Sequence, residues 1–279
     1  MIGGRPTAVL FARRRTAIAA ALVALAGLPW AGRQSTAPLN PARPDADRLN
    51  ANRPNADGVL GGPPSADPLH FSPEELRELQ RRFGVHGPQP RLAQLFTEGI
   101  DQLQPLRSFT LQRLEDLRPV ILKESRRQHV NPVFVAAVLF DEMRHAKPGE
   151  GIPIAARSGL FSTHGPGQVA VSELMHQGLL PRDASEEQIA EARLKLLQPE
   201  TNVTVLVGKF ARLSRELGFP RSRTLQASHS KRDAKALATL AYLHNGKLDY
   251  PGRLLRYMQD PELHALIYGH RSRIVSPLI

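Results

Sequence analysis

The arrangement best suited to chemistry in this 279-residue sequence is a pair of acids at the end of an apolar run. Asn131 and Pro132 open the run, residues 133–140 are all Val, Ala, Leu or Phe, and Asp141 and Glu142 follow. A carboxylate at the end of such a core-packed helix is costly to bury unless it is paired, and the usual relief is a raised pKa. We therefore expect Glu142 to stay protonated near neutral pH and to donate a proton; the alternative is a solvated acid at a helix end.

The elements that must position these acids are predicted to be helices. Ser72-Pro73-Glu74-Glu75 and Ser185-Glu186-Glu187-Gln188 each form a capping box, which marks a helix start. Residues 146–167 are rich in Gly and Pro and predict a long loop or a short hairpin. Capping signals and apolar periodicity predict helices over residues 72–82, 90–128 with a break near Pro105, 132–142, 169–177, 186–197, 200–217, 231–244, 251–259 and 261–268. The expected fold class is mostly α.

The N-terminal part is predicted to be a leader rather than part of the fold. Arg13-Arg14-Arg15 precedes the apolar residues 16–28, which is typical of a signal peptide over residues 1–32; the alternative is an anchor that is never cleaved. The Pro-rich residues 33–70 lack hydrophobic periodicity and predict a disordered linker. The folded domain is then expected over residues 71–279, and the protein is expected to be exported, periplasmic or extracellular, with no stable membrane span after processing.

The amino-acid composition excludes several kinds of active site and favours anionic binding partners. The formal net charge of +11 favours anionic partners, but aromatic residues make up only 5%, which argues against nucleic acid because few stacking platforms are present. The absence of cysteine excludes disulfides, thiolate metal sites and a Cys nucleophile. The histidines lack the tight spacing of a metal site, and no Gly-x-Ser-x-Gly elbow of a serine hydrolase is present.

Four segments together resemble a known family. Asn131 to Glu142 is similar to the entry into the catalytic helix of soluble lytic transglycosylases and lysozyme-like muramidases, in which a Pro begins the helix and the catalytic Glu follows ten positions later. Gly165-Pro166-Gly167-Gln168-Val169, Glu200-Thr201-Asn202-Val203 and Ala241-Tyr242-Leu243-His244-Asn245-Gly246 resemble the family's later motifs, in the family's order. The resemblance covers residues 118–246 and implies a lysozyme-like catalytic domain, with residues 71–117 as an N-terminal helical extension.

The family's activity is cleavage of the β-1,4 bond between N-acetylmuramic acid and N-acetylglucosamine in peptidoglycan glycan strands. The resemblance implies that Glu142 is the single catalytic acid, which then acts as the base that closes a 1,6-anhydro ring. It implies substrate-binding roles for Gln168, Tyr242, Asn245 and Gly165, with Tyr242 orienting Glu142, and it implies no metal and no cofactor.

Two further questions stay open from the sequence. A hydrolase would need a second carboxyl group about 5–9 Å from the first, and the nearby candidates are Asp141, Glu150 and Glu173. Asp141 is a poor partner because adjacent helical side chains point about 100° apart. The alternatives to an enzyme of cell-wall remodelling are an exported, non-enzymatic peptidoglycan-binding or secretion-assembly protein on the same fold, and an interbacterial muramidase toxin. An open groove at Glu142 would favour an enzyme.

Overall fold

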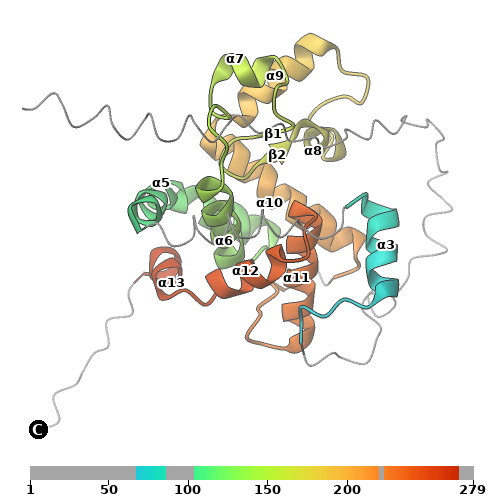
Figure 1. Ribbon diagram of the computed structural model, residues 1–279, viewed down its shortest axis with the longest axis vertical. Coiled ribbons are helices and arrows are strands. Elements are labelled where there is room, and N and C mark those ends of the chain that lie inside the picture. The colour runs from blue at the N-terminus through green and yellow to red at the C-terminus, as the bar shows by residue number, and fades with distance from the viewer. Residues whose placement is uncertain (1–66, 86–103, 220–222, 270–279) are drawn as a thin grey trace, which may run out of the picture. The chain divides into compact units, whose positions relative to one another are not determined.

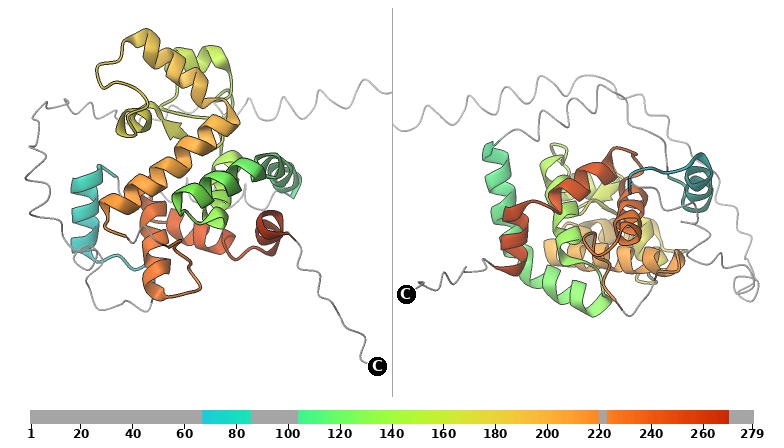
Figure 2. Two further views of the ribbon diagram at one scale, coloured as in Figure 1. Left: turned by 180° about the vertical axis from the view of Figure 1, so that it is seen from behind. Right: turned by 90° about the horizontal axis from the view of Figure 1, so that it is seen from below.

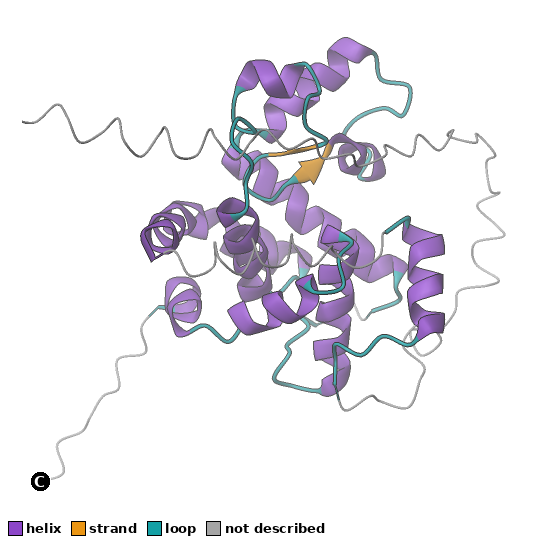
Figure 3. Ribbon diagram, in the orientation of Figure 1, coloured by secondary structure: helices purple, strands orange, loops and turns teal. Residues whose placement is uncertain are grey.

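Helices make up most of residues 67–85, 104–219 and 223–269, which are the residues that the computed structural model describes (Figures 1 and 3). All of them belong to the unit Asn52–Ile279. The strands among them form one two-stranded sheet, so the expected mostly α fold class is confirmed. The predicted leader, and the predicted linker as far as residue 66, lie outside the described residues.

The helices follow the predicted order, with small differences at their ends. Both predicted capping boxes are present, at Ser72 and at Ser185. The predicted helix over residues 90–128 is described only from Gln104 onward, and the predicted loop region contains one short helix of its own, α7. The elements are α3 (Pro73–Phe83), α5 (Gln104–Gln128), α6 (Pro132–Arg144), α7 (Pro153–Arg157), β1 (Thr163–His164), β2 (Val169–Ala170), α8 (Val171–His176), α9 (Glu186–Leu196), α10 (Pro199–Glu216), α11 (Lys231–Asn245), α12 (Tyr250–Tyr257) and α13 (Pro261–Tyr268).

Helix α6 lies at the centre of the described core. The Asn131 side chain caps it by accepting hydrogen bonds from the backbone N–H groups of Val133 and Phe134, at 2.9 and 3.1 Å. Its apolar residues 133–140 are at most 2% exposed, because α5, α12 and α13 pack against it. A helix that is apolar on all sides is stable only in such a position, and its far end delivers Asp141 and Glu142 into the interior.

Helix α10 joins two groups of elements (Figures 1 and 2). The elements α7, α8, α9 and the β1–β2 hairpin gather at one end of α10, and α11 and α3 lie toward its other end. Helix α10 also packs against α5 along the side of the core. Glu142 therefore stands at the end of α6 that leads toward the hairpin group. Within the described residues, no helix is long and apolar enough to cross a membrane.

The hairpin contains the glycine-rich motif of the sequence. Its two strands pair antiparallel, Thr163 with Ala170 and His164 with Val169, and residues 165–168 form the turn. Gly165 has a φ of 71°, and a Cβ atom there would lie 2.2 Å from the carbonyl oxygen of Leu196. Both the backbone conformation and the available space therefore require glycine at this position.

Asn202, at the start of α10, holds this turn in place. It is fully buried, and its side-chain oxygen accepts a hydrogen bond from the N–H of Gly167 at 2.8 Å. Its amide group donates to the carbonyl oxygens of His164 and Leu196, at 2.7 and 2.9 Å. One side chain thus connects the hairpin, the end of α9 and the start of α10.

We predict that Asn202→Ala destabilises the protein by at least about 2 kcal/mol, because three buried backbone groups would lose their partner. Urea unfolding followed by circular dichroism measures this change. Thr201→Ala is the matched control, since the neighbouring hydroxyl reaches only Gln198 and should matter little. Equal stabilities of the two variants would contradict this role of Asn202.

Candidate functional site

Three donors from the C-terminal helices converge on one oxygen of Glu142. The Tyr250 hydroxyl donates to Oε1 at 2.8 Å, and the Asn245 amide donates to the same atom at 3.3 Å. The Nε2 atom of His244 also lies 3.3 Å from Oε1. Among the described residues no hydrogen bond reaches Oε2, and the Glu142 side chain is 10% exposed. One carboxylate oxygen is therefore fixed, while the other is left for a further partner.

A sharp turn after α11 brings these donors together. Helix α11 ends at Gly246, which has the left-handed conformation at φ 81° and caps the helix through its N–H to the carbonyl oxygen of Tyr242. His244 and Asn245 are the last two residues of the helix, and Tyr250 is the first residue of α12. The turn folds α12 back toward the end of α6, so three donors that are close in sequence reach a carboxylate about a hundred residues upstream.

The raised pKa expected for Glu142 is wrong. Burial does raise the pKa of this carboxyl group, but the hydrogen bonds from His244 and from the Tyr250 hydroxyl outweigh burial. The pKa of Glu142 therefore lies below its ordinary value, and the resting group is a carboxylate at neutral pH. The expectation failed because it considered the apolar neighbours on the helix and not the donors from other helices.

Asp141 belongs to a separate ion pair on another side of α6. Arg253 donates to both of its oxygens, at 2.7 and 3.2 Å, and His145 lies 3.4 Å from Oδ2. The side chain is only 2% exposed. Burial raises the pKa of Asp141, but the His145 hydrogen bond and the Arg253 guanidinium hold it below its ordinary value. Asp141 therefore serves to attach α12 to α6.

Glu150 is the second carboxyl group near Glu142. It is 6% exposed, and burial, assisted by the negative charge of Glu142, raises its pKa although Lys147 opposes this. Gln168, in the hairpin turn, donates to Oε2 of Glu150 at 3.0 Å. The hairpin motif is thus connected to the acid site, and two carboxyl groups with oppositely shifted pKa values act on each other there. The third candidate, Glu173, is instead paired with Arg212.

Of the predicted residues Tyr242 and Asn245, only Asn245 contacts Glu142 among the contacts that the structure describes. Tyr242 is fully buried, its hydroxyl accepts a hydrogen bond from Gln80 of α3 at 3.4 Å, and its ring packs on Phe71. The expectation that Tyr242 orients Glu142 is therefore corrected, because Tyr250 occupies that position. Asn245 lies beside Glu142, and its Oδ1 is buried without a hydrogen-bond partner.

Gly165 and Gln168 both lie in the turn of the hairpin. The Gly165 carbonyl oxygen accepts a hydrogen bond from the Gln168 amide at 3.1 Å, and Thr163 donates to the same side chain at 2.6 Å. Gln168 itself has a positive φ of 45°. These contacts fix the amide in the orientation in which it donates to Glu150.

Sequence reasoning missed Tyr250 and the part played by His244. His244 lies inside the Ala241–Gly246 motif, but the sequence considered alone assigned it no role, because the histidines lack the spacing of metal ligands. The available signal for Tyr250 is that it begins the next predicted helix, a short turn after the Asn245-Gly246 helix stop. A chain reversal at such a stop can return the next helix to the end of the preceding one.

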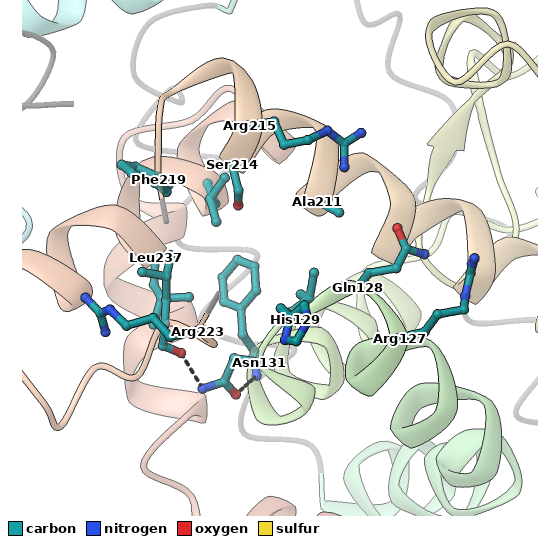
Figure 4. A pocket seen from close by; sticks show the side chains of 14 residues that line it. Arg127, Gln128, His129, Asn131, Ala211, Ser214, Arg215, Phe219, Arg223 and Leu237 are labelled. Atoms are coloured by element: carbon teal, nitrogen blue, oxygen red, sulfur yellow. Dashed lines mark hydrogen bonds between the residues drawn. The ribbon is translucent and has the colours of Figure 1, made fainter. Parts of the chain in front are cut away.

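A separate pocket lies at the opposite end of α6 (Figure 4). Its volume is about 250 Å³, and apolar side chains such as Phe134 and Leu237 form its inner wall. Arg127, Arg215 and Arg223 stand around it, and none of its lining residues is acidic. Since α6 rises about 1.5 Å per residue, this pocket is roughly 16 Å from Glu142 and is not part of the acid site.

Comparisons with known proteins assign neither a family nor a function to this chain. No protein-family model, curated protein or solved structure matches the chain. In the described part of the chain, no group of three or more His, Asp or Glu side chains is arranged to hold a metal ion. What the site can do must therefore be argued from its own geometry.

We predict that Tyr250→Phe raises the pKa of Glu142, because it removes a donor that stabilises the charged form. A lowered pKa contributes stability above the unfolded value of about 4.3, and this contribution is lost as the pH falls through the folded value. The variant should therefore be less stable than wild type by about 1–3 kcal/mol at pH 7, and the difference should shrink in acid.

Urea unfolding at a series of pH values from about 8 down to about 2, which spans the range below the unfolded pKa where the contribution is lost, tests this prediction. Tyr268→Phe is the control, because Tyr268 is 60% exposed. A loss of stability that stays the same at every pH would show that the hydroxyl does not act on the Glu142 carboxylate.

Proposed function

We propose that this protein cleaves the β-1,4 glycosidic bond of peptidoglycan, as a lytic transglycosylase in which Glu142 is the catalytic carboxyl group. The observation that carries the proposal is the carboxylate itself. It is almost buried at the end of an apolar helix, three donors hold one oxygen, and the other oxygen accepts no hydrogen bond from the described residues. A single oriented carboxyl group of this kind is what an acid–base mechanism without metal chemistry requires.

The reaction would use the two protonation states of Glu142 in turn. As a carboxylic acid it would protonate the oxygen of the leaving sugar, and as a carboxylate it would take the proton of the 6-hydroxyl that closes the 1,6-anhydro ring. The lowered pKa favours the second role in the resting protein. Substrate that covers the remaining exposed oxygen would expel water and raise the pKa, which favours the first role.

Asn245 is suited to both states. Its amide nitrogen donates to the carboxylate as the side chain stands, and its oxygen is buried without a partner. If the amide turns by 180°, donor and acceptor exchange places, and Oδ1 can accept the proton of the carboxylic acid. On this proposal Gln168 and Glu150, which are joined by a hydrogen bond, would face the sugar from the hairpin side.

Glu150 favours one second candidate, which is hydrolysis at the same site. Burial raises the pKa of Glu150 while that of Glu142 is lowered, and glycoside hydrolases use pairs of carboxyl groups whose pKa values are separated. The product would then carry a reducing end instead of a 1,6-anhydro end.

The basic composition, and the export expected from the sequence, would suit this substrate. The formal net charge of +11 suits an anionic wall polymer. We propose an exported location, periplasmic or extracellular, on the basis of the sequence of residues 1–32.

We predict that Glu142→Gln lowers the rate of peptidoglycan cleavage by at least about 10²-fold, because the transferable proton is lost. The glutamine oxygen can still accept from the three donors, so the fold should persist. Release of soluble fragments from purified peptidoglycan measures the rate, and thermal unfolding checks the fold.

Glu115→Gln is the matched control, since Glu115 is an exposed glutamate on α5 and should have no effect on the rate. A Glu142→Gln variant that keeps the wild-type rate would remove Glu142 from the mechanism. A wild-type protein that binds peptidoglycan without cleaving it would favour the non-enzymatic alternative.

A further inference from the structure

His244 links Glu142 to a lysine that the mechanism above does not use. Its Nε2 atom lies 3.3 Å from Oε1 of Glu142, and its Nδ1 atom lies 3.1 Å from Nζ of Lys209 on α10. The same ammonium group also donates to the backbone oxygen of His244 at 3.4 Å. The His244 side chain is 1% exposed, so these two partners, and not water, determine the state of the ring.

The charge of Lys209 determines which nitrogen of the ring carries the proton. Burial lowers the pKa of Lys209 to about 8, which leaves the group mainly as an ammonium at pH 7. An ammonium has three donors and no acceptor, so Nδ1 must present its lone pair to it. Burial and the nearby Lys209 charge lower the pKa of His244, so the ring is neutral and its one proton is on Nε2.

The proton on Nε2 faces the carboxylate of Glu142. The other neutral tautomer would place a lone pair of His244 against the ionised oxygen, and the two would repel each other. A neutral histidine in water takes both tautomers, so a buried partner is needed to select one of them.

We propose that Lys209 is a positioning residue, which acts through His244 by fixing the tautomer that donates a hydrogen bond to Glu142. The effect on catalysis rests on the proposed function, whereas the effect on the tautomer does not. A partly buried lysine present only for packing would gain nothing from its charge, since an apolar side chain of similar length fills the same space at lower cost.

The surroundings of Lys209 are consistent with a charged group. The negative charges of Glu173 and Glu142 favour its ammonium form, whereas Arg212 opposes it. Arg212 is itself neutralised by Glu173, to which it donates from Nε at 3.0 Å and from Nη2 at 2.5 Å. The described structure thus supports a cation at Nζ.

The test is nitrogen NMR of the full chain labelled with ¹⁵N-histidine at pH 7. His244→Gln assigns the His244 signals by their disappearance. We expect protonated Nε2 and unprotonated Nδ1 in the wild type, the same pattern in Lys209→Arg, and a mixed or reversed pattern in Lys209→Met. Lys195→Met, at an exposed lysine of α9, is the control and should leave the pattern unchanged.

Two results would overturn the proposal directly: Nδ1 protonated in the wild type, or an unchanged tautomer in Lys209→Met. Kinetics on solubilised peptidoglycan fragments provide the second readout. Lys209→Met should lower kcat by at least about tenfold with KM unchanged, because one hydrogen bond to a charged group is lost. A changed tautomer with full kcat would show that Lys209 does not position Glu142 for catalysis.

The two proposals can fail separately. If the wild type cleaves no peptidoglycan, the proposed function is wrong, and the tautomer of His244 still decides whether Lys209 controls the donor to Glu142. If the wild type is active and the tautomer does not respond to Lys209, only the positioning role is lost.

Discussion

Removing the Glu142 carboxylate from water is the constraint on which the arrangement of the C-terminal helices depends. An ionised group at the end of an apolar helix would be prohibitively costly without donors. His244, Asn245 and Tyr250 supply them, which requires α11 to end where it does and α12 to turn back toward α6. The adjacent Asp141 faces the same problem and is satisfied separately by Arg253. The two carboxylates at the end of α6 therefore hold α11 and α12 in place through hydrogen bonds, in addition to the apolar packing around the helix.

The donors also decide the resting chemistry of the site. Burial alone would have produced a protonated acid, but the donors reverse the direction of the pKa shift of Glu142. Glu150 accepts hydrogen bonds from the backbone N–H of Lys147 and from the Gln168 amide, but burial outweighs these donors and its pKa shifts the other way. The site thus holds a carboxylate and, beside it, a carboxyl group that keeps its proton to higher pH. Acid–base cleavage of a glycosidic bond can use either the first group in two states or both groups together.

Local signals predicted much of this fold but only part of the site. Capping residues such as Ser72 and Asn131, and the apolar run after Pro132, determine where helices begin and which of them is central, because these effects act within one or two turns. The Glu142 pKa and the role of Tyr250 depend on side chains about a hundred residues away, which no local pattern encodes. Tyr242 shows the same limit: its place in a recognised motif did not reveal that its hydroxyl faces α3.

The measurement that tests the account most directly is mass spectrometry of the fragments released from purified peptidoglycan by the wild-type protein, with the Glu142→Gln variant as the blank. The account predicts muropeptides with 1,6-anhydro ends from the wild type and almost none from the variant. Reducing ends in place of anhydro ends would assign the chemistry to the Glu142–Glu150 pair as a hydrolase. No release of fragments by the wild type would contradict the claim that Glu142 is a catalytic carboxyl group.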